Sequence, residues 1–186
     1  LFRELRRIDS PQGPRVTYRK REYILLASND YLGLANHPRV IEALREAAQQ
    51  FGVGAGASRL ISGNMSLHER LEEAVAWLKE TETALLFNSG YTANVGLLPA
   101  LAGPGDAVYL DRLCHASLFD GALLSRARLF RYRHNDLNHL ENLLSKPGKF
   151  RRRWIVTEGI FSMDGDIVPL PQLLSLGERY GAYLFL

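Results

Sequence analysis

From Thr83 onward, short apolar runs alternate with stretches of helical periodicity, and this alternation restricts the possible folds more than any other feature. The runs that we predict to be strands are Thr83–Phe87, Ala107–Asp111, Leu129–Tyr132, Trp154–Thr157 and Ala182–Leu186. The helices predicted between them are Tyr91–Leu101, Ser117–Ala127, Leu137–Leu144 and Leu170–Tyr180. Short strands that alternate with helices form a mostly parallel sheet covered by helices on both faces. The pattern therefore predicts an α/β fold of three layers.

The residues before this alternation are organised differently. Glu22–Ala27 is predicted as a short strand, and His37-Pro38 opens a helix that Gly52 can end. A glycine-rich loop extends to Gly63, and Ser66 and Glu69 form the capping box of a second helix. The glycine run of the loop nearly matches a dinucleotide-binding motif. We reject that interpretation because Ala57 replaces the third glycine and the run follows a helix.

Composition places the chain among ordinary globular domains. It has 186 residues, 46% hydrophobic and 23% charged, with a formal net charge of +3. No apolar stretch approaches the roughly 20 residues of a membrane helix. The start, LFRELRR, lacks the apolar segment of a signal peptide. The single cysteine, Cys114, excludes an internal disulfide and fits a cytoplasmic location.

Two basic runs, Arg19–Arg21 and Arg151–Arg153, invite a nucleic-acid interpretation. Each precedes a predicted strand, and neither is interleaved with stacking aromatic residues. We therefore interpret both as solvated loop charge and expect no nucleic-acid or membrane partner.

Ligands of parallel sheets bind beyond the carboxyl ends of the strands, so the loops that follow strands hold the candidate site. The loop at Ser89-Gly90-Tyr91 opens a helix, where free N–H groups bind phosphate, but from this stretch alone we favour an ordinary N-cap by Ser89 and a glycine turn. His115 is either a capping residue or a site residue. The stretch Thr157–Asp166 carries three acids and a serine, which suit a glycine turn, solvated carboxylates or part of a metal site. No histidine stands nearby to complete a metal site, so none is predicted.

Taken together and in this order, these segments resemble the α-oxoamine synthase family of pyridoxal-phosphate enzymes, which have the fold of aspartate aminotransferase. The matching stretches are ASNDYLGLANHP, GVGAGASRLISGN, LHERLEE, ALLFNSGYTANVG, DRLCHASLFDG and TEGIFSMDGDIVPL. The resemblance implies that residues 1–36 form an N-terminal segment with a short strand. It implies that residues 37–186 are the first part of the cofactor-binding large domain.

The resemblance also assigns roles to individual residues. It implies that His115 stacks on the cofactor ring and acts in catalysis, and that Ser162 lies near the phenolic oxygen of pyridoxal 5'-phosphate. The cofactor site implied comprises Ser89, Gly90, Tyr91, His115, Glu158 and Ser162. Asn29 is implied near the amino-acid carboxylate and Arg3 near the acyl-CoA site. The family works as a homodimer, with the glycine-rich loop near the interface.

The reaction implied is a decarboxylative condensation of an amino acid with an acyl thioester. The segments SRLISGN and TEGIFSMDGD favour L-alanine with pimeloyl-CoA or a pimeloyl carrier protein, as in biotin synthesis. Glycine with acetyl-CoA is the alternative. In the family, a segment like GAYLFL leads into the acid that pairs with the pyridine nitrogen, and the Schiff-base lysine lies well beyond it. Lys20, Lys79, Lys146 and Lys149 match no such motif. We therefore expect an N-terminal half of a synthase, inactive alone, or a non-catalytic fragment that dimerises.

Overall fold

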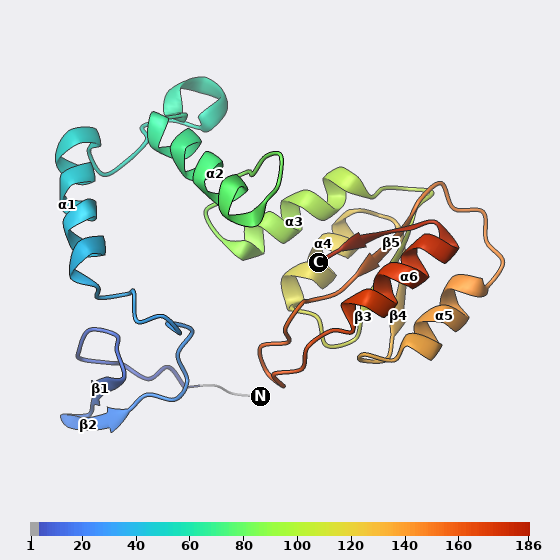
Figure 1. The fold of residues 1–186 in the computed structure, drawn as a ribbon, viewed down its shortest axis with the longest axis horizontal. Coiled ribbons are helices and arrows are strands. Elements are labelled where there is room, and N and C mark those ends of the chain that lie inside the picture. The colour runs from blue at the N-terminus through green and yellow to red at the C-terminus, as the bar shows by residue number, and fades with distance from the viewer. Residues whose placement is uncertain (1–3) are drawn as a thin grey trace. The chain divides into compact units, whose positions relative to one another are not determined.

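The structure is a computed structural model that describes residues 4–186. It divides into two compact units (Figure 1), a first that ends at Glu80 and a second that spans Thr81–Leu186. Each unit is described by itself. The expected division at residues 36 and 37 stays a prediction about the domains of a longer protein.

The first unit begins with an antiparallel hairpin of β1 (Arg15–Tyr18) and β2 (Arg21–Ile24). The second strand confirms the predicted run in a shorter form. Its partner β1 was not predicted. Arg19 and Lys20 form the turn with positive φ angles of 49° and 62°, as a two-residue hairpin turn requires. This basic run is solvent-exposed, as expected.

Two helices and a short π-helical turn complete the first unit. They are α1 (Pro38–Phe51), η1 (Arg59–Gly63) and α2 (Ser66–Lys79). His37 caps α1 and Gly52 ends it, as predicted. The predicted capping box of α2 is wrong by one residue. Met65 is the N-cap, and His68 Nδ1 accepts the Met65 N–H at 3.0 Å, because the imidazole supplies the acceptor that Glu69 was expected to provide.

The second unit contains a four-stranded parallel sheet in the order β4-β3-β5-β6. Its strands are β3 (Ala107–Asp111), β4 (Arg128–Tyr132), β5 (Arg153–Val156) and β6 (Ala182–Phe185). Its helices are α3 (Gly90–Leu101), α4 (Ala116–Leu124), α5 (Leu137–Ser145) and α6 (Leu170–Tyr180). The parallel sheet predicted from the alternation is confirmed.

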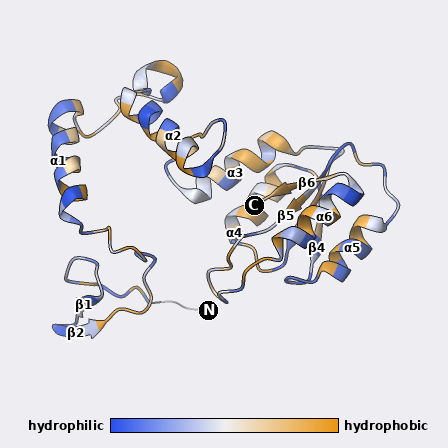
Figure 2. Ribbon diagram, viewed as in Figure 1, coloured by the Kyte–Doolittle hydropathy of each residue, from blue (hydrophilic) through white to orange (hydrophobic). Residues whose placement is uncertain are grey.

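The helices cover both faces of this sheet because the side chains of β3 alternate between two buried clusters. Tyr109 packs with α5 and α6 through Leu140 and Leu173. Val108 and Leu110, on the opposite face, pack with α3 and α4, where Leu98 and Leu118 are buried. Figure 2 shows hydrophobic residues concentrated along the strands and α3. The three-layer architecture follows from this alternation.

One predicted strand is wrong. Thr83–Phe87 belongs to neither sheet of the structure. An extended apolar run becomes a strand only where a neighbouring strand offers its edge. Neither edge strand of the parallel sheet, β4 or β6, pairs with this run in the described chain, so it forms no strand.

The second basic run is not simply solvated loop charge, as the sequence suggested. Arg151 forms two hydrogen bonds of 2.9 Å with Asp106, whose side chain is fully buried. Arg152 lies 3.7 Å from the same carboxylate, and Arg153 donates to the Tyr180 carbonyl. Asp106 also accepts the Gly103 N–H, so this cluster joins the start of β3 to the start of β5.

Candidate active site

A cavity of about 450 Å³ lies at the carboxyl ends of the parallel strands, within the second unit. Its volume is in the usual range for small-molecule sites. The residues that line it come from the start of α3, the start of α4, the loop after β5 and the end of β6. They are Gly90, Tyr91, Asn94, His115, Ser117, Leu118, Thr157, Glu158, Gly159, Phe185 and Leu186.

The first turn of α3 presents backbone N–H groups at one wall of the cavity. Ser89 is the N-cap, and its Oγ accepts the Thr92 N–H at 3.1 Å. Ala93 donates to the Ser89 carbonyl. Among the described residues, neither Gly90 nor Tyr91 donates its N–H to another group of the chain, as expected for the first residues of a helix.

Gly90 is not required by packing within the chain. A Cβ atom added at this position would meet no protein atom within 4 Å. Tyr91 is fixed by its hydroxyl, which donates to Asp120 of α4 at 2.8 Å. This hydrogen bond is the main cause of the raised pKa of Tyr91, and the phenol therefore stays neutral at physiological pH.

The imidazole of His115 is held by α4 and α3 together. Nδ1 accepts the Ser117 N–H at 3.2 Å and lies 2.7 Å from Ser117 Oγ. Because Nδ1 accepts the Ser117 N–H, this nitrogen carries no proton. The Ser117 hydroxyl therefore also donates to Nδ1, and the proton of the neutral ring is on Nε2. Ser117 Oγ in turn accepts from Asn94 Nδ2 at 2.9 Å. Ser117 is fully buried, so this chain of polar groups fixes the ring.

A glycine makes that arrangement possible. A Cβ at Gly121 of α4 would lie 2.7 Å from the Asn94 carbonyl oxygen and 3.2 Å from Leu98. Glycine therefore lets α4 approach α3 closely, and the close approach brings Asn94 within hydrogen-bond distance of Ser117.

The loop after β5 supplies Glu158, whose carboxylate accepts the backbone N–H of His115. The loop after β3 and the loop after β5 thus meet directly at the cavity. Cys114, next to His115, is not a nucleophile in this arrangement. Burial raises the pKa of its thiol, and the nearby acids Asp111 and Glu158 raise it further, so the neutral thiol persists.

The structure brings together four of the residues that the sequence predicts for the cofactor site: Gly90, Tyr91, His115 and Glu158. Ser89 stands beside them as the N-cap. Ser162 is exposed in the loop after β5 and does not line the cavity. Asn29 is an exposed residue of the first unit. Arg3 lies outside the described residues.

Sequence reasoning missed Asn94 and Ser117. Asn94 follows Gly90 by one helical turn, and Ser117 follows His115 by two residues, so both spacings carried a usable signal. The missing information was that α3 and α4 cross at Gly121. Among residues 4–186, no cluster of histidine, cysteine or acidic side chains is arranged to hold a metal ion.

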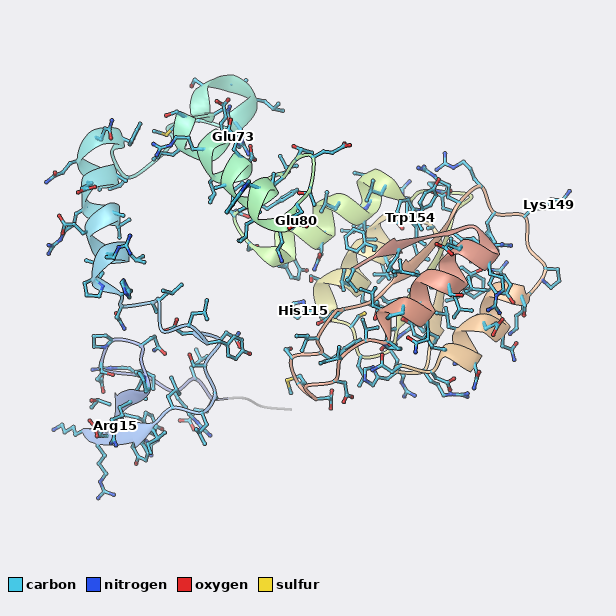
Figure 3. The ribbon with its side chains drawn as sticks, in the orientation of Figure 1. Arg15, Glu73, Glu80, His115, Lys149 and Trp154 are labelled. Atoms are coloured by element: carbon cyan, nitrogen blue, oxygen red, sulfur yellow. The ribbon has the colours of Figure 1, made fainter. Side chains whose placement is uncertain are left out.

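The lysines of the described chain are not part of the cavity. Figure 3 places Lys149 at the opposite end of the second unit from His115, and none of the four lysines lines the cavity. No helix in the described part of the chain is sufficiently long and apolar to cross a membrane.

The chain is similar in sequence and in fold to proteins of known function. The 8-amino-7-oxononanoate synthases of Geobacter sulfurreducens and Citrifermentans bemidjiense are each 56% identical over 99% of this chain and 47% of their own length. A serine palmitoyltransferase structure from S. paucimobilis matches with a TM-score of 0.93 and 34% identity, over 97% of this chain and 46% of that one. The chain thus spans about half the length of the relatives it matches. The family profile described as aminotransferase class I and II matches residues 21–186. The chain belongs to the aminotransferase class I and II family.

Proposed function

We propose that the protein containing this chain condenses L-alanine with pimeloyl-CoA or a pimeloyl carrier protein to give 8-amino-7-oxononanoate for biotin synthesis. Carbon dioxide and the free thiol leave. The observation that carries this proposal is the 56% identity to 8-amino-7-oxononanoate synthases across nearly all of the chain. Identity to the serine palmitoyltransferase of similar fold is lower, at 34%.

The residues of the cavity fit pyridoxal 5'-phosphate as the cofactor. The N–H groups of Gly90 and Tyr91 and the dipole of α3 suit a phosphate, and Gly90 leaves the backbone open to close approach. The His115 ring, held in place by Ser117, offers a flat surface to an aromatic ring. When bound, pyridoxal phosphate supplies an electron sink for the carbon that loses its carboxyl group.

The chain's own residues bind and orient in this proposal. His115 is assigned to the face of the cofactor ring and is the catalytic residue of this proposal. Glu158 holds the backbone of His115 in place. Ser162 is assigned to the phenolic oxygen of the cofactor, Asn29 to the amino-acid carboxylate and Arg3 to the acyl-CoA site. We assign the Schiff-base lysine and the acid at the pyridine nitrogen to the half of the relatives' length that this chain does not cover.

The proposed assembly is a homodimer in the cytoplasm. Its support is an exposed apolar surface on the first unit. Val40, Ile41 and Leu44 of α1 are at least 41% exposed, and no residue of this helix is buried. Leu60 and Ile61 of the predicted interface loop are 97% and 81% exposed. Apolar surface of this kind is characteristic of an interface.

The test is a substrate comparison with the full-length protein loaded with pyridoxal phosphate. We expect faster release of thiol from pimeloyl-CoA with L-alanine than from acetyl-CoA with glycine, and a product with the mass of 8-amino-7-oxononanoate. Faster turnover of glycine with acetyl-CoA would identify the protein as a glycine C-acetyltransferase instead.

A second candidate, of another class, is a non-catalytic fragment that acts as a dimerisation partner. It is favoured by the absence of a lysine from the cavity lining among the described residues. Intact mass of the protein isolated from its natural source decides between the two. A mass near 20.9 kDa would support the fragment, and a mass about twice as large would support the synthase.

A further inference from the structure

His134, in the loop after β4, joins two carboxylates that belong to different loops of the site. Its Nδ1 lies 3.1 Å from Asp111 Oδ1, and its Nε2 lies 3.0 Å from Asp166 Oδ2. The rings of His134 and Phe161 meet edge to face, with a centroid distance of 4.4 Å. We refer to this arrangement as the Asp111–His134–Asp166 contact.

The Asp111 end of the contact is rigid. Asp111 is the last residue of β3, and its side chain is fully buried. Oδ1 also accepts the Leu113 N–H at 2.9 Å, and Oδ2 accepts the Asn135 N–H at 2.9 Å. Asp111 therefore fixes the loop that leads to His115 together with the loop that carries His134.

The Asp166 end of the contact belongs to the loop that carries Glu158 and Ser162. This loop closes on itself through three backbone hydrogen bonds, from Phe161 N–H to the Asp166 carbonyl, from Gly165 N–H to the Phe161 carbonyl and from Val168 N–H to the Gly159 carbonyl. The Asp166 side chain is 54% exposed. His134 contacts the loop at both Asp166 and Phe161, and thus ties the loop to the end of β3.

The chemistry of the contact requires a doubly protonated ring. A neutral imidazole has one N–H, whereas this ring faces a carboxylate oxygen at each nitrogen. Burial lowers the pKa of His134, and the hydrogen bonds with Asp111 and Asp166 raise it by more, so the pKa stands above its usual value. The other neighbours are the uncharged Phe161 ring and Asn135, whose amide nitrogen Nδ2 lies 3.4 Å from Nε2 and does not accept its proton.

We propose that His134 is a positioning residue whose imidazolium holds the loop after β5 against the end of β3 and thereby sets Glu158 relative to His115. His134 does not line the cavity, so it acts through these loops. The consequence for catalysis rests on the proposed function, but the consequence for the loop does not.

The first test measures hydrogen exchange of the loop amides in the full-length protein. We expect exchange at Phe161, Gly165 and Val168 to rise about tenfold in His134→Gln and in Asp166→Ala, which corresponds to ~1.4 kcal/mol of local opening. His139→Gln and Asp164→Ala are the matched controls. The first alters a nearby histidine that accepts only the Arg133 N–H, and the second removes an acid from the same loop.

The pH dependence of exchange separates positioning by charge from a general packing effect. In the unmodified protein, after correction for intrinsic rates, loop exchange should rise as the pH passes the raised pKa of His134. In Asp166→Ala this transition should be absent. If His134→Gln does not fold, Asp166→Ala still decides the question, because Asp166 is largely exposed.

The second test is kinetic. Asp166→Ala should reduce kcat/KM for the condensation several-fold at neutral pH, and Asp164→Ala should not. Unchanged loop exchange in both His134→Gln and Asp166→Ala would overturn the positioning role, whatever the activity. If exchange changes as expected but the full-length protein condenses no substrate, the proposed function fails and the role of His134 in the loop stands.

Discussion

The backbone N–H of His115 donates to the carboxylate of Glu158, and this hydrogen bond joins the loop after β3 to the loop after β5. The two residues are 43 positions apart in the chain and meet because β3 and β5 are adjacent parallel strands. This hydrogen bond and the strand pairing together fix one wall of the cavity.

Ser117→Ala should weaken both cofactor binding and the fold. The change removes the buried hydroxyl that joins Asn94 to His115, so the free energy of unfolding should fall by about 1 kcal/mol. The Kd for pyridoxal phosphate in the full-length protein should rise several-fold, because the His115 ring is no longer held in one orientation. Absorbance titration with the cofactor measures the change. Ser145→Ala, at the end of α5, is the control and should bind normally.

Gly90→Ala should separate ligand binding from stability. No protein atom lies near the new Cβ, so the melting temperature should stay the same or rise slightly. The affinity for pyridoxal phosphate should fall about tenfold, or ~1.4 kcal/mol, if a phosphate approaches the start of α3. Gly103→Ala, whose Cβ would make only ordinary contact with Arg151, should change neither quantity. Normal affinity in Gly90→Ala would place the phosphate elsewhere.

The Asp111–His134–Asp166 contact should stabilise the protein at low rather than high pH. The pKa of His134 is raised in the folded state, so its stabilisation is complete below the unfolded value of about 6.5 and is lost as the pH rises through the folded value. The melting temperature of the unmodified protein should exceed that of Asp166→Ala below a pH of about 6.5, and the difference should shrink as the pH rises through the raised pKa of His134. A constant difference would contradict the assignment.

Arg151→Ala should destabilise the second unit through Asp106. The hydrogen bonds from Arg151 lower the pKa of Asp106 to about 2, against the opposing effect of burial. A group with a lowered pKa stabilises the fold above its unfolded pKa of about 3.9, and this stabilisation is lost as the pH falls toward the folded value. At neutral pH Arg151→Ala should therefore lower the denaturation midpoint, because the buried Asp106 carboxylate loses two of its hydrogen bonds. Denaturation of this variant, compared with Lys149→Ala, measures it.

Residues 1–186 expressed alone should not catalyse the condensation. None of the four lysines lines the cavity, so the cofactor has no partner there for a covalent link. Borohydride trapping with pyridoxal phosphate, followed by peptide mass spectrometry, should find no stoichiometric adduct at one lysine. A single-site adduct together with turnover of L-alanine and pimeloyl-CoA would show that this stretch is sufficient.

The parallel sheet was predicted well because each strand and helix leaves a pattern within its own short stretch of sequence. The run Ala107–Asp111 is buried at all five positions, and Leu170–Tyr180 is a helix with the predicted bounds. Apolar runs and helical periodicity report burial directly. Strand pairing is not local, and the misassigned run Thr83–Phe87 shows the difference. Its residues have strand-like character, but their state depends on an edge that the sequence pattern does not identify.

The sequence predicts those site residues whose place is set by the backbone. It does not predict those whose place is set by the packing of helices against each other. The carboxyl-end rule places His115 and Glu158 in neighbouring loops, after β3 and β5, and both line the cavity. Gly90 lines it as well, but the rule does not account for it, because the run before Gly90 is not a strand in the structure. Asn94 and Ser117 join them because two helices cross at Gly121. A helix crossing depends on the whole packed unit, and no motif in the sequence states it.

The parallel register of the sheet has a consequence for how this site can change. Leu110 of β3 pairs with Val156 of β5, and Val156 pairs with Phe185 of β6. Deleting one residue from β5 would shift every later residue by one pairing and would turn Glu158 toward the opposite face of the sheet. The loops beyond the strands carry no such constraint. New substrate preferences in proteins with this sheet should therefore arise by substitution or insertion in those loops, while strand lengths stay fixed.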